Sequence, residues 1–168
     1  MRRLLVLILL CSSVVFAQRH RSVISGSAPQ ILRPISDVST TGWTSTEANI
    51  WSAVAQPSDS KFITSVVLGT ADATVDLASG TDPGVDTGHK IHIRIITLGD
   101  DFSLTLVDAT NGDIATVTLG QLAVGNNTID IAEANVADIS DYTTLTMRLI
   151  SNAITTGTVV DEVYLETP

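Results

Sequence analysis

The side chains that could do chemistry in this sequence are aspartates, glutamates, three histidines and two tryptophans. No G-x-S-x-G nucleophile motif, glycine-rich phosphate loop, H-E-x-x-H pair or set of metal-spaced cysteines is present. Two carboxylates flanking a cleft can hydrolyse a glycosidic bond. Nearly all of the acids, however, fall in expected turns or on polar strand faces. We therefore expect a protein that is not an enzyme, with a small hydrolase as the least favoured alternative.

Two loops carry aspartates that would suit calcium. The segment "GTDPGVDTGH" holds Asp82 and Asp86, and "LGDD" holds Asp100 and Asp101. Calcium prefers oxygen ligands on loops, but aspartate before Pro-Gly is also ordinary turn chemistry. No EF-hand spacing accompanies them. We expect no cofactor, with calcium at these four aspartates as the alternative.

The stretch "VSTTGWTSTEANIW" holds both tryptophans, which could either stack on sugars or fill a core. Only 4% of the residues are aromatic, so placing both tryptophans on the surface would leave the core thin. Trp43 is therefore predicted to be a core residue. If the protein binds carbohydrate, the candidates for stacking are Trp51, Tyr142 and Tyr164.

These side chains must be positioned by strands, because hydrophobic residues recur at every second position. In "KIHIRIIT", Ile91, Ile93 and Ile95 share one face, and "FSLTLVD" and "TTLTMRLIS" repeat the pattern. Turn signals separate the runs, among them Asn111-Gly112, which is typical of a hairpin with a type I′ turn. A further turn is expected at 125–127. The spacing predicts an all-β fold: a single antiparallel β-sandwich, jelly-roll or immunoglobulin-like.

At most one or two short helical turns interrupt the predicted strands. Thr44 and Glu47 stand at capping-box spacing before a segment that stops at Pro57, which predicts a helical turn there. The segment "IAEANVADISDY" is read as a second short helix or a crossing loop.

The N-terminus has the pattern of a secretory signal peptide over residues 1–17. Arginines precede a short hydrophobic run, and small residues precede a cleavage site after Ala17. Cleavage would remove the single cysteine, so the mature chain would have no disulfide. We expect a secreted protein with no membrane attachment after cleavage.

Residues 18–31 are predicted to form a flexible arm, and residues 32–168 the sandwich domain. The arm carries Arg19, His20 and Arg21 ahead of an acidic body, so it could dock on a neighbouring copy and support self-association. The whole sequence has 9 Lys and Arg against 18 Asp and Glu, a formal net charge of −9. Such acidity argues against nucleic acid as a partner, because phosphates would be repelled.

Four segments resemble a known family in their order and spacing: "ILRPISDVSTTGW", "TDPGVDTGH", "DISDYTTL" and "VDEVYLETP". The chain resembles a family of small, mostly uncharacterised all-β proteins found in tailed-phage and environmental viral or bacterial sequences. The resemblance implies a jelly-roll-like sandwich and a role in virion or extracellular structure. It supplies no catalytic residues.

Our functional prediction from the sequence is a non-catalytic structural or adhesive module of a virion or of an extracellular surface assembly. Its partners would be copies of itself or other surface proteins. The alternative is a secreted carbohydrate-binding module with glycan partners. The export signal departs from the family pattern, because phage structural proteins that assemble in the cytoplasm do not need one, and it leaves a secreted bacterial surface protein as a serious rival to the virion role.

Overall fold

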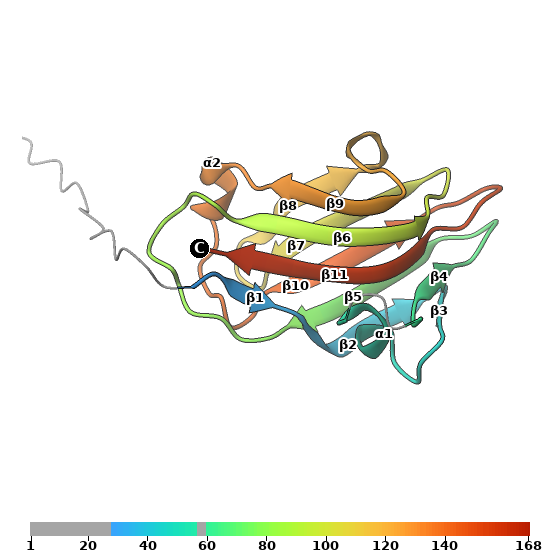
Figure 1. Ribbon diagram of the computed structural model, residues 1–168, viewed down its shortest axis with the longest axis horizontal. Helices are drawn as coiled ribbons and strands as arrows, with labels where there is room; N and C mark the ends of the chain where they lie inside the picture. The colour runs from blue at the N-terminus through green and yellow to red at the C-terminus, as the bar shows by residue number, and fades with distance from the viewer. Residues whose placement is uncertain (1–27, 57–59) are drawn as a thin grey trace, which may run out of the picture.

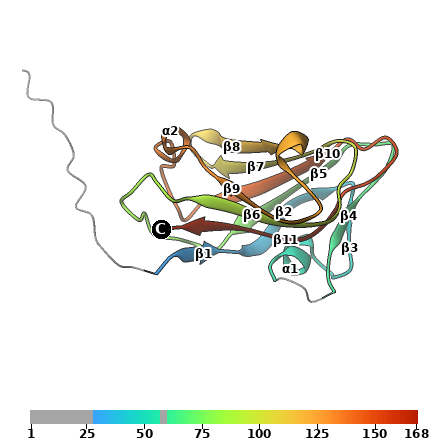
Figure 2. The ribbon, with the colours of Figure 1, turned by 45° about the horizontal axis from the view of Figure 1, so that its top comes forward.

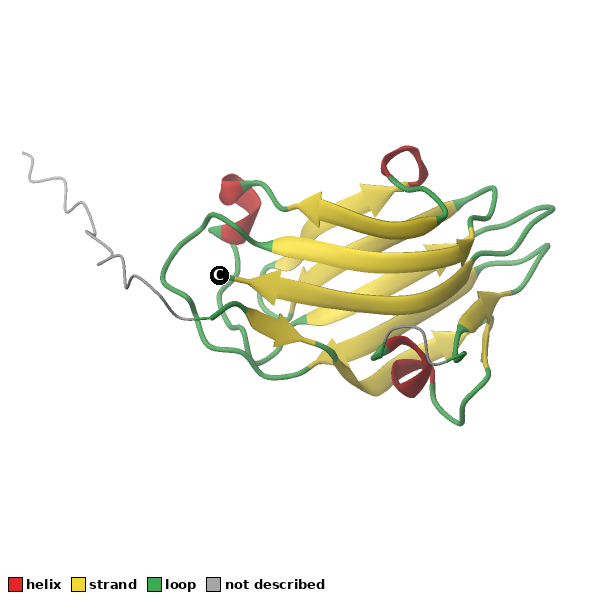
Figure 3. Ribbon diagram, in the orientation of Figure 1, coloured by secondary structure: helices red, strands yellow, loops and turns green. Residues whose placement is uncertain are grey.

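The computed structural model describes residues 28–56 and 60–168, which form two antiparallel β-sheets packed face to face (Figure 1). Strands are the predominant secondary structure in this part of the chain, and the two α-helices are short (Figure 3). The predicted antiparallel β-sandwich with one or two helical turns is therefore confirmed. The signal peptide, Arg19, His20 and Arg21 lie outside the described residues.

Sheet A is the front layer of Figure 1 and has the order β3-β4-β11-β6-β9, with β1 also paired to β11. Its strands are β1 (Gln30–Leu32), β3 (Trp43–Ser45), β4 (Ile63–Ser65), β6 (Lys90–Thr97), β9 (Gly125–Asp130) and β11 (Val159–Thr167). Sheet B lies behind it in the order β2-β5-β10-β7-β8. Its strands are β2 (Pro34–Thr41), β5 (Ala71–Leu77), β7 (Phe102–Asp108), β8 (Gly112–Thr118) and β10 (Thr146–Ser151).

From β4 onward, nearly every connection passes from one sheet to the other, and the β7–β8 hairpin is the exception. Figure 2 shows these connections at the two ends of the sandwich. Such crossing is typical of a jelly roll. The helices α1 (Ile50–Val54) and α2 (Glu133–Val136), with the 3₁₀ turn Leu119–Gln121, lie in the connections.

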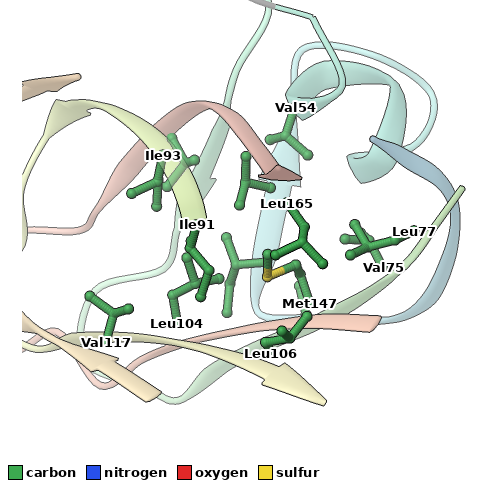
Figure 4. Packing of buried hydrophobic residues seen from close by; sticks show 14 of the residues in the cluster. Val54, Val75, Leu77, Ile91, Ile93, Leu104, Leu106, Val117, Met147 and Leu165 are labelled. Carbon is green, nitrogen blue, oxygen red and sulfur yellow. The ribbon is translucent and has the colours of Figure 1, made fainter. Parts of the chain in front are cut away.

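The core lies between the two sheets and comes from the alternation seen in the sequence. Ile91, Ile93 and Leu165 of sheet A face Leu104, Leu106 and Met147 of sheet B (Figure 4), and all six are almost fully buried. The expected inward faces of these strands are thus confirmed. Burying aliphatic side chains in this way is the main source of stability in a domain of this kind.

Trp43 is a core residue, as predicted, with 7% of its surface exposed. Its ring meets Phe102 edge to face, with the ring centroids 6.3 Å apart. This contact joins β3 of sheet A to β7 of sheet B. The tryptophan therefore closes one corner of the sandwich.

The predicted capping box at Thr44 and Glu47 is wrong. Thr44 lies in β3, where it pairs with Thr64 of β4, and α1 begins only after Asn49. The Asp37 carboxylate on β2 accepts hydrogen bonds from the backbone N–H groups of Ile50 and Trp51. A residue distant in sequence thus caps this helix in place of a local serine or threonine.

The Asn111-Gly112 signal does mark a hairpin, but not one with a type I′ turn. Strands β7 and β8 pair directly. Gly112 has a φ of 80°, whereas Asn111 is not among the described residues with positive φ. A type I′ turn needs positive φ at both central residues, so the connection is a longer loop closed by Gly112.

Candidate functional site

The outer face of sheet A carries polar side chains in rows that cross three adjacent strands. β11, β6 and β9 are neighbours, and their registers align residues from each strand. We call this surface the three-strand face. Its rows, each taken in the order β11, β6, β9, are Glu166–Lys90–Asp130, Tyr164–His92–Thr128 and Glu162–Arg94–Asn126.

A depression of about 370 Å³ lies on this face, within the size range of ligand sites. Its lining comes from all three strands: His92, Ile93, Arg94, Asn126, Asn127, Thr128, Glu162 and Tyr164. Amide, hydroxyl, guanidinium and carboxylate groups meet there. The depression thus offers mainly hydrogen-bonding groups.

Of the proposed stacking residues, Tyr164 lines the depression, but both faces of its ring are in contact with other side chains. The His92 ring is stacked on it at a centroid distance of 4.4 Å, with the planes 8° apart. The Arg33 guanidinium lies 4.7 Å from the Tyr164 centroid. Burial, reinforced by the nearby Glu162 carboxylate, raises the pKa of the Tyr164 hydroxyl. The faces of this ring are therefore occupied, and no hydrogen bond among the described residues uses its hydroxyl.

Acidic side chains from β11 hold the basic groups around the depression in place. The Arg94 guanidinium donates a hydrogen bond to Asp161 at 2.6 Å, and the Arg33 guanidinium donates one to Glu162 at 2.7 Å. An irregularity in the β11–β6 register between Val160 and Glu162 allows the consecutive residues Asp161 and Glu162 each to hold an arginine. Bulges of this kind redirect side chains next to functional sites.

The two asparagines beside the depression differ in their roles. The Asn127 amide accepts a hydrogen bond from the Ala123 N–H and donates to the carbonyls of Ala123 and Gly125, which fixes the loop before β9. No hydrogen bond among the described residues uses the Asn126 side chain, which is exposed. The expected turn at 125–127 is in fact the start of β9, so the sequence analysis missed Asn126 as a site residue.

Trp51 and Tyr142 do not line the depression. Trp51, in α1, is partly buried and packs against the core. Tyr142 has only 6% of its surface exposed, and its hydroxyl lies 2.7 Å from Nε2 of His89. Tyr142 is a core residue with no ring face open to a sugar. It is therefore no longer a candidate for sugar stacking.

The four aspartates proposed for calcium do not meet at one point. Asp82 Oδ1 accepts a hydrogen bond from the Gly84 N–H, as in an ordinary turn. Asp100 accepts hydrogen bonds from the backbone N–H groups of Ile154 and Thr155, which lowers the pKa of its carboxyl group. No group of three or more metal-binding side chains occurs within residues 28–56 and 60–168. Asp86 and Asp101 add no further ligand cluster in this range.

Strand β1 begins at Gln30, two residues before the predicted domain start at 32. Gln30–Leu32 pairs with β11 of the same chain, so this segment completes its own sheet rather than a neighbour's. Within the part of the chain that the structure describes, no helix is long and apolar enough to span a bilayer.

No family model matches the chain, and no curated protein matches it. Among solved structures, it is similar to a fucose-binding module of Streptococcus pneumoniae, SpX-3, with 15% identity, a TM-score of 0.47, and coverage of 80% of this chain and 99% of that one. It is similar to the lectin-binding domain of lectinolysin complexed with Lewis b, with 13% identity, a TM-score of 0.47, and coverage of 85% and 93%. A carbohydrate-binding module of Cellvibrio mixtus lichenase 5A, in complex with cellotriose, has 12% identity, a TM-score of 0.41, and coverage of 83% and 97%.

Proposed function

We propose that this protein is a secreted, non-catalytic glycan-binding module whose site is the depression on the three-strand face. The supporting observation is the set of polar groups there that have hydrogen-bonding capacity to spare. No hydrogen bond among the described residues uses the Asn126 amide or the Tyr164 hydroxyl. The Thr128 hydroxyl lies 3.2 Å from Nδ1 of His92, in the same cross-strand row as Tyr164 and two residues along β9 from Asn126.

These groups suit a ligand rich in hydroxyl groups. An amide both donates and accepts, a hydroxyl does the same, and the flanking Arg94 and Glu162 add a cationic donor and an anionic acceptor. Hydrogen bonds to ionised groups are stronger than those between neutral groups. Because the Tyr164 ring faces are occupied, the sugar would be held edge-on by hydrogen bonds rather than by stacking.

The carboxylates nearest the depression favour binding over hydrolysis. A glycosidase needs one carboxyl group to donate a proton and a second to act as base or nucleophile. Asp161 and Glu162 are instead each bonded to an arginine at 2.6–2.7 Å. Each of these carboxylates is therefore engaged by a guanidinium, which competes with a glycosidic bond for its oxygens.

A structural or adhesive role in a surface or virion assembly is the second candidate, and one end of the sandwich favours it. Leu68 and Ile154 are 81% and 67% exposed on the β4–β5 and β10–β11 loops. A hydrogen bond from the Leu68 N–H to the Ala153 carbonyl, 2.8 Å, joins these loops. If this end binds another subunit, the Leu68→Ser/Ile154→Ser variant will have a lower mass by light scattering than the wild type. Equal monomer masses at high protein concentration would exclude self-assembly through this end.

Glycan binding can be tested with a glycan array followed by calorimetry on the best ligand. We expect Asn126→Ala to weaken binding by about tenfold, as the loss of one to two hydrogen bonds would. Asn152→Ala removes a similarly exposed amide from the β10–β11 loop and serves as the control. Absence of any glycan ligand, or equal losses in the two variants, would contradict the proposal.

A further inference from the structure

Arg94 and His92 on the three-strand face, and Arg33 beside it, each lie close to an acidic residue of β11. We infer that Asp161, Glu162 and Glu166 determine specificity: the first two neutralise the arginines around the depression, Glu166 adds a negative charge beside His92, and the three acids together select uncharged glycans over acidic ones. This inference rests on the proposed function and names the class of glycan that the same site accepts.

The three contacts are short, and two of the acids are well buried. Asp161 lies 2.6 Å from Arg94 and Glu162 lies 2.7 Å from Arg33, with side chains only 3% and 11% exposed. The third acid, Glu166, has its Oε2 3.1 Å from Nε2 of His92. Since strand β11 fixes these acids, an anionic ligand would have to compete with partners that are already in place.

The charge of the whole face points the same way. The fixed cations on the face and beside it are Arg33, Lys90 and Arg94, and the anions are Asp130, Asp161, Glu162 and Glu166. Anions therefore exceed fixed cations on the face, and the sequence as a whole carries a formal charge of −9. A uronate or sulfate group would approach a negative surface, where like charges repel.

An uncharged sugar meets no such barrier. Arg33 uses only Nη1 for its hydrogen bonds to Glu162 and to the Ala55 carbonyl, and a guanidinium has N–H groups on two further nitrogens. Glu162 accepts through Oε1, and a carboxylate has a second oxygen. Hydroxyl groups can use both at once, because they donate to the carboxylate and accept from the guanidinium. The ion pairs would then contribute directional hydrogen bonds without a net attraction for anions.

Oligosaccharide pairs that differ only in charge test this inference. We would measure binding of galacto- and galacturono-oligosaccharides, and of manno- and mannurono-oligosaccharides, by calorimetry at low salt. We expect the neutral member of at least one pair to bind the wild type about tenfold or more tightly than its acidic counterpart. The preference should shrink as salt is added, because salt screens charges at the surface.

Variants locate the origin of the preference. Glu162→Gln keeps a hydrogen-bond acceptor for Arg33 but removes the charge, and Glu166→Gln does the same near His92. In each variant, the ratio of the affinity for the neutral oligosaccharide to the affinity for its acidic counterpart should fall at least threefold. Asp113→Asn, on the exposed face of β8 in sheet B, changes the net charge equally and should leave this ratio unchanged.

The outcomes separate the two proposals. Acidic members that bind as tightly as neutral ones would overturn this inference and leave glycan binding intact. An affinity ratio that falls equally in Asp113→Asn would also overturn it, since overall charge would then explain the preference. Failure of every oligosaccharide to bind, including the array ligands, would overturn the proposed function and this inference with it.

Discussion

His92 and Tyr164 stack face to face across neighbouring strands, with ring centroids 4.4 Å apart and ring planes 8° apart. The β6–β11 register places them directly opposite each other. Cross-strand pairs of this kind stabilise a sheet. Tyr164 therefore has a structural role through its ring, and the proposed function assigns its hydroxyl to the ligand.

Replacing Tyr164 separates these two roles. Tyr164→Phe keeps the ring between His92 and Arg33, so we expect unchanged stability and weaker glycan binding. Tyr164→Ala removes both ring contacts and should lower the free energy of unfolding by about 1–3 kcal/mol. Urea denaturation and calorimetry on both variants check this. Full glycan affinity in Tyr164→Phe would show that the hydroxyl does not bind the sugar.

The two tryptophans should differ in their contribution to stability. Trp43 is buried against Phe102, so we expect Trp43→Ala to cost about 3–5 kcal/mol. Trp51 is only partly buried in α1, so Trp51→Ala should cost clearly less. Chemical denaturation of both variants measures the difference. Equal losses would mean that Trp51 supports the core as much as Trp43 does.

Asp108 ties the β7–β8 loop to the segment before β10, and its ionisation should matter for acid stability. Burial opposes ionisation, but N–H groups of Asn111, Thr110 and Ser140 donate to the carboxylate and lower its pKa to about 2. The ordinary pKa of an aspartate, 3.8, applies to the unfolded chain, and the folded protein has the lower value. The ionised Asp108 therefore stabilises the fold fully above pH 3.8, and this stabilisation is lost as the pH falls toward 2. The contribution at neutral pH is at most about 2 kcal/mol.

We therefore expect Asp108→Asn to be less stable than the wild type at pH 7 and to lose this difference near pH 2. Urea denaturation across this range measures it. A constant difference at all pH values would assign the effect to packing rather than to the charge.

Buried His89 should also make the protein sensitive to acid, at higher pH. Burial lowers the pKa of its imidazole below 6.5, so the folded protein disfavours the protonated form that the unfolded chain accepts. The free energy of unfolding should fall as the pH drops below 6.5. His89→Gln should remove this dependence, and His92→Gln should retain it. Thermal melts between pH 7 and pH 5 would reveal it, and identical pH profiles for wild type and His89→Gln would exclude it.

Gly157 allows the β10–β11 loop to approach β4 closely. A Cβ at this position would lie 2.5 Å from the Ser65 carbonyl oxygen, which is backbone and cannot easily move. We expect Gly157→Ala to cost about 1–3 kcal/mol. Gly120→Ala, with no atom within 4 Å of the added Cβ, is the control and should be nearly neutral. Thermal denaturation distinguishes the two.

The sandwich could be predicted from the sequence because alternation reports directly on burial. The alternating isoleucines of β6 lie in the core, with Lys90, His92 and Arg94 between them on the other face. The start of α1 could not be predicted in the same way. Its cap is Asp37, 13 residues before the Ile50 N–H that it accepts from, and only the folded chain brings the two together.

The candidate site was largely hidden from sequence analysis for a similar reason. His92, Asn126 and Tyr164 come from three strands, and their approach depends on β9 and β11 lying on either side of β6. Sequence patterns predict strands but not the order in which crossing strands pair. Tyr164 could be proposed as an aromatic residue on a polar face. Asn126 was mistaken for a turn residue because it follows Gly125.

The pairing of β1 with β11 has a mechanical consequence. Gln30 lies opposite Thr167, so the chain enters β1 and leaves β11 at the same end of the sandwich. Tension applied between Gln30 and Thr167 would break the β1–β11 hydrogen bonds one pair at a time. It would not load all of these hydrogen bonds in shear at once. Fusion partners attached before β1 and after β11 would lie side by side. A short linker between these two ends of the sandwich would give a circularly permuted chain. The loops that carry Leu68 and Ile154, at the opposite end, would remain clear of either attachment.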